Sequence, residues 1–156
     1  MIVYGRNAVR EALRGRRSVR QVWATRAVED EPWLSGVAVA VAEREALTAR
    51  CASPDHQGVC ADAGPYPYAE PDALLAADDA LVVCLDQVQD PRNLGAICRV
   101  AECAGAAGVV IAERRAAEVT PVVCRTSAGA VEHLAVARVR NVADYLSKAK
   151  AAGAWV

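Results

Sequence analysis

The sequence predicts an α/β fold in two parts, a small α/β module over residues 1–68 and a parallel-sheet unit over residues 80–156. From residue 80 onward apolar runs alternate with amphipathic stretches, which implies a parallel sheet covered by helices. Between the parts lies GPYPY (64–68), which cannot continue regular structure because proline fixes φ and lacks an amide donor. The acidic run that follows, up to Asp79, predicts a linker over residues 69–79.

In the first part, Gly5 precedes a predicted helix whose Val9 and Leu13 face inward with a spacing of four residues. Apolar runs rich in valine predict strands at 19–25, 37–41 and 59–63, and a second helix is predicted at 43–50.

In the second part, the pattern predicts a strand at 80–85 and a helix at 93–104, then a strand at 108–112 and a helix near 121–130. A strand at 134–139, a helix at 141–152 and a strand that begins at Ala154 complete the alternation. Thr120 before Pro121 fits an N-cap followed by proline at the first helical position.

Composition restricts the class of protein. The chain is 54% hydrophobic and contains no phenylalanine, yet no run approaches the ~18 apolar residues of a membrane span. Arg6 and Arg10 interrupt the N-terminus, so a secretory signal is not predicted. The six cysteines contain no C-x-x-C pair and only two histidines accompany them, so we expect reduced core cysteines and no metal site. We therefore expect a soluble cytoplasmic protein with no membrane association.

The net charge of −1 conceals a strong asymmetry. Residues 1–26 carry seven arginines and one acid, residues 27–84 carry two arginines and eleven acids, and residues 85–156 carry nine bases and seven acids. Four arginines follow one another at spacings of four, four and three: Arg6, Arg10, Arg14 and Arg17. A helix would present them on one side, which suits contacts with the phosphates of a nucleic acid; the alternative is a solvated charged face.

The stretch LDQVQDPRNLGAICRVAECAGAAGVVI (85–111) is the most informative part of the chain. It reads as a βαβ unit, and open α/β sheets place their ligands at the loop that follows the strand. Within it Asn93, Gly95 and Arg99 form an N-x-G-x-x-x-R string. Arg99 lies off the apolar face of the predicted helix, so its guanidinium can point outward while the helix stays packed.

The segment DPRNLGAICRVAECAG resembles the first signature of the SpoU/TrmH-type RNA 2′-O-ribose methyltransferases, which belong to the SPOUT class. RTSAGAVEHL (125–134), Asn141 and Gly153-Ala154-Trp155 agree with this resemblance. YGRNAVREAL (4–13) and HQGVCA (56–61) resemble the small RNA-binding domain that many members carry in front. The resemblance covers nearly the whole chain, in the order of the family.

The resemblance implies a cofactor, S-adenosyl-L-methionine, which members hold in a C-terminal trefoil knot built from an L-G-x-E-G-type loop and an S-L-N-type segment. Neither motif occurs before Val156. We therefore expect a SPOUT-type domain truncated before its knot, inactive alone and without cofactor-binding residues. The resemblance also implies RNA as partner, with 23S-type ribosomal RNA as the expected substrate, and a homodimer in the full-length protein.

By the resemblance, Arg99 activates the ribose 2′-hydroxyl. A guanidinium rarely deprotonates, so we expect Arg99 to act electrostatically, by stabilising the developing alkoxide and clamping the adjacent phosphate. The alternative is a surface arginine paired with Glu102 or Glu113.

Other residues of these motifs carry predictions of their own. Asn93 is the second residue predicted to be catalytic, and it is expected to cap its helix, to present donors to the substrate, or both. Gly95 is expected to permit close approach of RNA or of a partner subunit, and Arg92 to make a second phosphate contact. His56 is expected either to hydrogen-bond RNA or to hold a loop. The segment 125–130 is expected to form a tight passage, with a supporting role of Arg125 or Ser127 at the active site as the second possibility.

Two other functions remain open from the sequence. The basic first part could act alone as a non-catalytic RNA-binding module. A Rossmann-type nucleotide-binding protein is disfavoured, because no G-x-G-x-x-G follows a strand.

Overall fold

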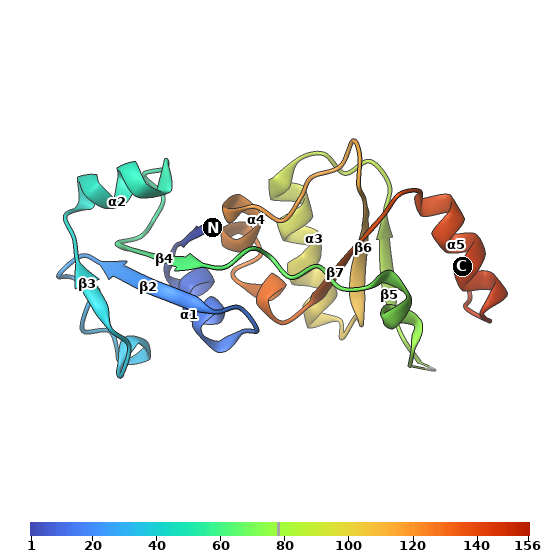
Figure 1. Ribbon diagram of the computed structural model, residues 1–156, viewed down its shortest axis with the longest axis horizontal. Coiled ribbons are helices and arrows are strands. Elements are labelled where there is room, and N and C mark those ends of the chain that lie inside the picture. The colour runs from blue at the N-terminus through green and yellow to red at the C-terminus, as the bar shows by residue number, and fades with distance from the viewer. Residues whose placement is uncertain (78) are drawn as a thin grey trace.

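The computed structural model describes residues 1–77 and 79–156 and shows two sheets that follow one another along the molecule (Figure 1). The first sheet has four strands in the order β1-β4-β2-β3, and the second has three strands in the order β5-β6-β7. The predicted α/β fold in two parts is confirmed.

The first sheet is mixed. Its strands are β1 (Ile2–Tyr4), β2 (Val19–Ala24), β3 (Val39–Val41) and β4 (Val59–Ala63). Strand β4 lies antiparallel to β1 and β2, while β2 pairs with β3 in parallel. Strand β1 was not predicted, because three residues give too short a pattern to recognise.

Helices cover both faces of this sheet. Val9 of α1 (Arg6–Arg14) packs in a cluster with Val59 and Ala61, whereas Leu47 of α2 (Arg44–Cys51) packs in a cluster with Cys60. Since successive strand residues point to opposite faces, α1 and α2 lie on opposite sides of β4.

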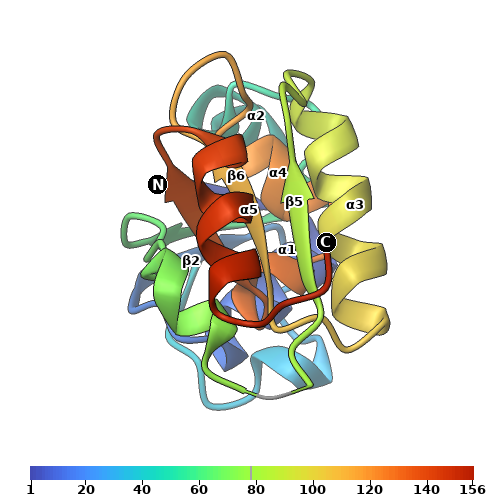
Figure 2. The same ribbon diagram turned by 90° about the vertical axis from the view of Figure 1, so that its right-hand side faces the viewer.

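The second sheet is parallel throughout, as predicted. Its strands are β5 (Val82–Leu85), β6 (Gly108–Ala112) and β7 (Ala135–Val139), and its helices are α3 (Pro91–Cys103), α4 (Pro121–Thr126) and α5 (Val142–Ala151). Val109 and Ile111 of β6 pack in the cluster that includes residues of α3 and α4, and Val110 packs in the cluster that includes Tyr145 of α5. Helices α3 and α5 therefore lie on opposite faces of the sheet (Figure 2).

The start of α3 differs from the prediction. The helix begins at Pro91, and the Asp90 carboxylate caps it by accepting a hydrogen bond from the Arg92 amide at 2.8 Å. Proline fits the first helical position because its missing amide hydrogen has no partner there. The prediction that Asn93 opens and caps the helix is wrong, since Asn93 lies inside the first turn.

Two predictions at the ends of later elements are also wrong. Helix α4 ends at Thr126, because Ala128 (φ 53°) and Gly129 (φ 88°) adopt left-handed backbone conformations that no helix continues. No strand begins at Ala154: residues 154–156 have no regular structure and Trp155 is fully exposed.

The segment predicted as a linker packs against the second sheet. Ala69 forms a parallel bridge with Ala137, and a 3₁₀ helix, η2 (Pro71–Leu75), buries Leu74. A side chain at Gly108 would collide with Leu74, so the contact is tight. Asp78, inside the predicted linker, lies outside the described residues.

The two parts touch directly. Helix α1 lies against η3 (Ala130–Glu132), where an added Cβ at Gly15 would come within 2.8 Å of Glu132 Cβ. An added Cβ at Gly129 would come within 2.6 Å of Glu11 Cβ. Both distances are too short for real carbon atoms, so glycine is required for this packing. None of the helices in the described ranges is long and apolar enough to cross a membrane.

Candidate functional site

Arg99 points away from the core of the second part. Leu94, Cys98 and Ala101 of α3 are buried, while Arg99 is exposed. It lines a hollow of about 210 Å³ whose other lining residues are Glu11, Glu102, Ser127, Ala128, Ala130 and His133. Within residues 1–77 and 79–156, no hydrogen bond or ion pair engages its guanidinium, so the alternative pairing with Glu102 or Glu113 is not observed.

Asn93 lies elsewhere on the same helix. It is exposed and lines a second hollow, of about 510 Å³, together with Gln87, Val88, Gln89, Ala96 and Ile97. Six residues of an α-helix turn through about 600°, which places Asn93 roughly 120° away from Arg99 around the axis. The structure therefore does not bring Asn93 and Arg99 into one hollow. Arg92 is exposed and, seven residues before Arg99, lies on nearly the same side of α3.

Gly95 faces α4 rather than solvent. A Cβ at this position would overlap Thr126 Oγ1 and lie 3.1 Å from the Ser127 amide nitrogen. Ser127 is fully buried, and its hydroxyl donates to the Cys124 carbonyl at 3.1 Å. The prediction that RNA or a partner subunit approaches Gly95 is wrong, and the prediction of a tight passage at 125–130 is confirmed.

Arg125, also in this segment, connects the second part to the first. Its Nε donates to the Asp55 carbonyl at 3.2 Å, and another guanidinium nitrogen lies 3.5 Å from the Asp55 carboxylate. Arg125 also lines a hollow of about 230 Å³ with Gly5, Asn7, Ala8 and Gln57.

Of the five arginines predicted to bind RNA, three lie on α1 and reach solvent: Arg6, Arg10 and Arg14. Arg6 forms an ion pair with Glu31 at 2.9 Å. Arg10 and Arg14 both pair with one oxygen of Glu11, at 2.8 and 3.6 Å. The side chains of these three arginines are 47%, 39% and 61% exposed, so their guanidinium groups remain available to a phosphate.

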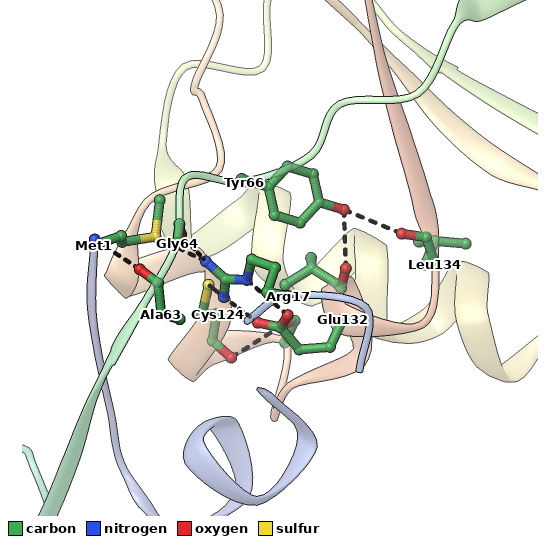
Figure 3. A network of polar contacts seen from close by, with 10 residues as sticks. Met1, Arg17, Ala63, Gly64, Tyr66, Cys124, Glu132 and Leu134 are labelled. Carbon is green, nitrogen blue, oxygen red and sulfur yellow. Dashed lines mark hydrogen bonds and ion pairs between the residues drawn. The ribbon is translucent and has the colours of Figure 1, made fainter. Parts of the chain in front are cut away.

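Arg17 is not part of this row. Helix α1 ends at Arg14. Arg17 lies beyond this end, between the two parts of the molecule, where its side chain is buried against Glu132 (Figure 3). Its Nε donates to Glu132 Oε2 at 2.9 Å, and a second nitrogen contacts Oε1. Burial acts to lower the pKa of Arg17, but hydrogen bonding to Glu132 outweighs it and the pKa is raised. The prediction that Arg17 binds RNA is wrong, because no phosphate can reach it.

His56 is also internal. Its ring is fully buried: Nδ1 accepts a hydrogen bond from the Gly58 amide at 3.0 Å, and Nε2 lies 3.1 Å from the Thr48 hydroxyl. Burial and the nearby Arg44 lower its pKa. Both ring nitrogens are thus engaged within the protein, so His56 holds the loop before β4 and the RNA contact predicted for it is wrong.

The sequence analysis missed two members of the site. His133 Nε2 lies 2.9 Å from Glu11 Oε2, although the two residues are 122 positions apart. Burial acts to raise the pKa of Glu11, but the contacts with His133, Arg10 and Arg14 outweigh burial and leave it below its ordinary value. No local pattern could have predicted a contact between residues so distant in sequence.

Comparison with known proteins identifies the family. Residues 80–156 match the SpoU rRNA Methylase family, and residues 2–69 match the RNA 2′-O ribose methyltransferase substrate binding family. YacO of Bacillus subtilis, which is assigned to the TrmH family of tRNA/rRNA methyltransferases, is 37% identical over 99% of this chain and 67% of its own length. The chain belongs to the SpoU/TrmH family of RNA methyltransferases.

Other relatives are longer than this SpoU/TrmH chain. A tRNA/rRNA methyltransferase of uncharacterised function from Mycolicibacterium vanbaalenii is 39% identical, with 99% of this chain and 54% of that protein covered. The SpoU methyltransferase AviRb from Streptomyces viridochromogenes, solved with AdoMet, is 25% identical with a TM-score of 0.74, covering 98% of this chain and 61% of AviRb. The chain thus spans about half to two thirds of the length of these relatives.

Neither of the two hollows near the carboxyl ends of the strands of the second sheet encloses S-adenosyl-L-methionine. The hollow between Asp86 and the start of α5, at the carboxyl ends of the strands, measures about 200 Å³, whereas ligand pockets commonly hold about 300–1,000 Å³. The hollow beside Asn93 is larger, but Gln87, Gln89 and Asn93 are exposed and leave it open. Within the part of the chain that the structure describes, no group of three histidine, cysteine or acidic residues could hold a metal ion.

Proposed function

We propose that the protein carrying these residues is an S-adenosyl-L-methionine-dependent RNA 2′-O-ribose methyltransferase that acts on 23S-type ribosomal RNA. The observation that carries the proposal is Arg99, which is exposed and lines a hollow together with Glu11 of the matched substrate-binding region. Among the residues that the structure describes, no carboxylate forms an ion pair with it. A guanidinium that is exposed and held by no ion pair within the described residues is available to an anionic substrate.

Arg99 acts on the RNA hydroxyl. S-adenosyl-L-methionine supplies a methyl group bonded to a sulfonium. The ribose 2′-oxygen must pass its proton to water or to the neighbouring phosphate as it bonds to the methyl carbon, whose bond to sulfur breaks to leave a neutral thioether. Arg99 stabilises the negative charge that develops on this oxygen. Its planar fork can hold the neighbouring phosphate at the same time. Asn93, on another side of α3, supplies donors to a different part of the substrate or to a neighbouring loop.

The cofactor is assigned to segments outside these 156 residues. The small or open hollows described above support this assignment, as does the resemblance to proteins with a C-terminal knot. Residues 1–156 alone are therefore expected neither to bind S-adenosyl-L-methionine nor to methylate RNA, which calorimetric titration with the cofactor tests. Saturable one-to-one binding by residues 1–156 would refute this assignment. A homodimer in the cytoplasm is the proposed working form of the whole protein.

The test of the proposed function uses the whole gene product that contains these residues. Ribosomal RNA is incubated with it and S-adenosyl-L-methionine, and ribose methylation is mapped by mass spectrometry. We expect methylation by the wild type, and for Arg99→Ala loss of methylation with RNA still bound. Arg99→Lys should recover little activity, since lysine lacks the planar fork. Near-normal turnover of Arg99→Ala would refute the role of this arginine.

A non-catalytic RNA-binding module is the alternative function. The exposed Arg6 and Arg14 of α1, with the partly exposed Arg10 between them, favour it. Salt-dependent RNA binding by the whole gene product, with no methylation of any RNA tested, would support this alternative.

A further inference from the structure

Cys51 and Cys60 lie at the two ends of one loop of the first part. Cys51 is the last residue of α2, and Cys60 belongs to β4. Between them the chain reverses, with left-handed backbone at Ala52 (φ 50°) and again at Gln57 (φ 55°). As a result the half-buried Cys51 packs in one apolar cluster with the fully buried Cys60.

The two sulfur atoms are close enough to interact. A hydrogen bond from the Cys60 thiol is the largest influence on Cys51 and lowers its pKa, although burial acts to raise it. The same hydrogen bond raises the pKa of Cys60, and burial adds to this effect. Cys51 is therefore the first of the two to ionise, and the thiolate is the form that reacts with oxidants.

Arg50 adds positive charge beside this pair. Its guanidinium carbon lies 3.9 Å from the centre of the Trp23 ring, and Trp23 is the cross-strand neighbour of Cys60. Stacking of a guanidinium on an indole ring is favourable, so the cation is held in place. Its charge contributes to the lowered pKa of Cys51. Electropositive, partly exposed surroundings of this kind are typical of cysteines that are readily oxidised.

The loop between the two cysteines carries contacts to other elements. The Asp55 carbonyl accepts a hydrogen bond from Arg125 of the second part at 3.2 Å. Gln57 Oε1 accepts one from the Arg6 amide, at the start of α1, at 2.9 Å. A covalent link between the ends of the loop would restrict its backbone, because a disulfide removes conformational freedom from the segment that it closes. Such a link would thus act on a contact between the two parts.

We propose that Cys51 and Cys60 form a redox-sensitive pair, which hydrogen peroxide converts into a disulfide that fixes the loop 52–59. The Cys51 thiolate attacks one peroxide oxygen and the O–O bond breaks. The sulfur becomes a sulfenic acid, and the released hydroxide takes up the proton that Cys51 had lost, forming water. The Cys60 sulfur then attacks the sulfenic sulfur, so that the S–S bond forms and the S–O bond breaks. The leaving hydroxide and the Cys60 proton form a second water.

The order of the two steps follows from the same contacts. Hydrogen bonding to Cys51 is the largest cause of the raised pKa of Cys60. Once Cys51 is a sulfenic acid, it carries no negative charge, so this cause is removed and Cys60 ionises more readily. Two thiols are oxidised and one peroxide is reduced, and no further reactant is needed. This chemistry is independent of methyl transfer.

Mapping of the linked peptides tests the pair. The whole gene product is treated with hydrogen peroxide, the remaining thiols are blocked with N-ethylmaleimide in guanidinium chloride, and the chain is cut before aspartates. Because Asp55 is the first aspartate after Asp30, peptides 30–54 and 55–61 stay together only through the disulfide. We expect this linked pair after oxidation and its loss after dithiothreitol. Cys84, also half-buried but with a pKa raised by burial, should remain reduced and be blocked.

Variants separate the roles of the two sulfurs. In Cys60→Ala, Cys51 should stop at the sulfenic acid, which dimedone traps, whereas in Cys51→Ser the buried Cys60 should stay reduced. Cys84→Ser is the matched control and should form the link as the wild type does. Hydrogen exchange of the amides of residues 52–58 should slow several-fold on oxidation of the wild type and stay unchanged in Cys51→Ser.

Three results would overturn the proposal. The first is oxidation of Cys84 before Cys51, which would mean that the contacts of Cys51 do not activate it. The second is a sulfenic acid at Cys51 of the wild type without any linked peptide, which would mean that Cys60 cannot reach it. The third is a link that forms without any slowing of exchange in the loop.

Discussion

Arg17 and Glu132 form a buried ion pair that joins the two parts of the molecule across 115 positions of sequence. Each side chain is only 1% exposed, and Arg17 also donates to the Gly64 carbonyl at 3.3 Å. Glu132→Ala would leave a buried guanidinium without its carboxylate, which typically costs about 3–5 kcal/mol. We expect this loss in the free energy of unfolding, measured by urea denaturation.

An exposed pair provides the matched control. Lys148 and Asp72 lie 2.6 Å apart, yet 62% and 66% of their side chains are exposed. Lys148→Ala should therefore change stability by no more than about 1 kcal/mol. Replacing Arg17 and Glu132 together by Met and Leu should restore most of the lost stability, because no unpaired charge then remains. Equal effects of Glu132→Ala and Lys148→Ala would contradict the role of the buried pair.

The low pKa of Glu11 predicts a pH-dependent contribution to stability. The folded-state pKa lies below its ordinary value of 4.5, so the unfolded chain binds the proton more readily than the folded protein does. The contribution of Glu11 is thus fully present above about pH 4.5 and is lost as pH falls through the folded pKa. Glu11→Gln cannot titrate, so its stability deficit relative to wild type should shrink as the pH is lowered from 6 to about 3. A deficit that stays constant over this range would contradict the prediction.

Elements that depend on local patterns could be predicted from the sequence. The strand at 108–112 was predicted with the bounds that β6 has, since the run Gly-Val-Val-Ile-Ala is buried on both faces of a parallel sheet. The start of α3 could also have been found. Asp90-Pro91 has the same cap-then-proline pattern that was recognised at Thr120-Pro121, and here the side chain does cap the helix.

Contacts between distant residues could not be predicted in the same way. The spacing of Arg6, Arg10, Arg14 and Arg17 fits one side of a helix. However, Gly15 directly follows the last residue of this helix, so Arg17 lies beyond it and forms its ion pair with a residue of the other part. The sequence shows that His56 lies two residues before Gly58, but not that its ring is buried. Such pairings depend on how the two parts pack, and packing is not encoded by residue spacing.

Gly95 is expected to be essential for packing α3 on α4. Gly95→Ala would drive a methyl group into Thr126, and overpacking of this kind typically costs about 1–3 kcal/mol. Thermal unfolding of Gly95→Ala should therefore begin at a clearly lower temperature than that of wild type. Gly64→Ala is the control, since its added Cβ would meet only the Ser18 carbonyl, at 3.9 Å. Equal melting temperatures of the two variants would show that α3 shifts freely.

The cysteines of the second part should differ sharply in reactivity. Burial raises the pKa of Cys98 and of Cys124 to about 12, so at pH 8 only about one thiol in ten thousand is ionised. Cys103 is exposed at the end of α3. Iodoacetamide, which attacks the thiolate, should therefore modify Cys103 in the native protein and leave Cys98 and Cys124 intact.

Mass spectrometry of the alkylated peptides checks this order, and the same reaction in guanidinium chloride should label all three cysteines. The outcome bears on the candidate site, because Cys98 precedes Arg99 and anchors the face of α3 opposite to solvent. Protection of Cys98 means that Arg99 stands on a helix that stays packed against the sheet. If Cys98 reacted in the native protein as fast as Cys103, α3 would open readily, and Arg99 would lack the fixed position that electrostatic stabilisation of the 2′-oxygen requires.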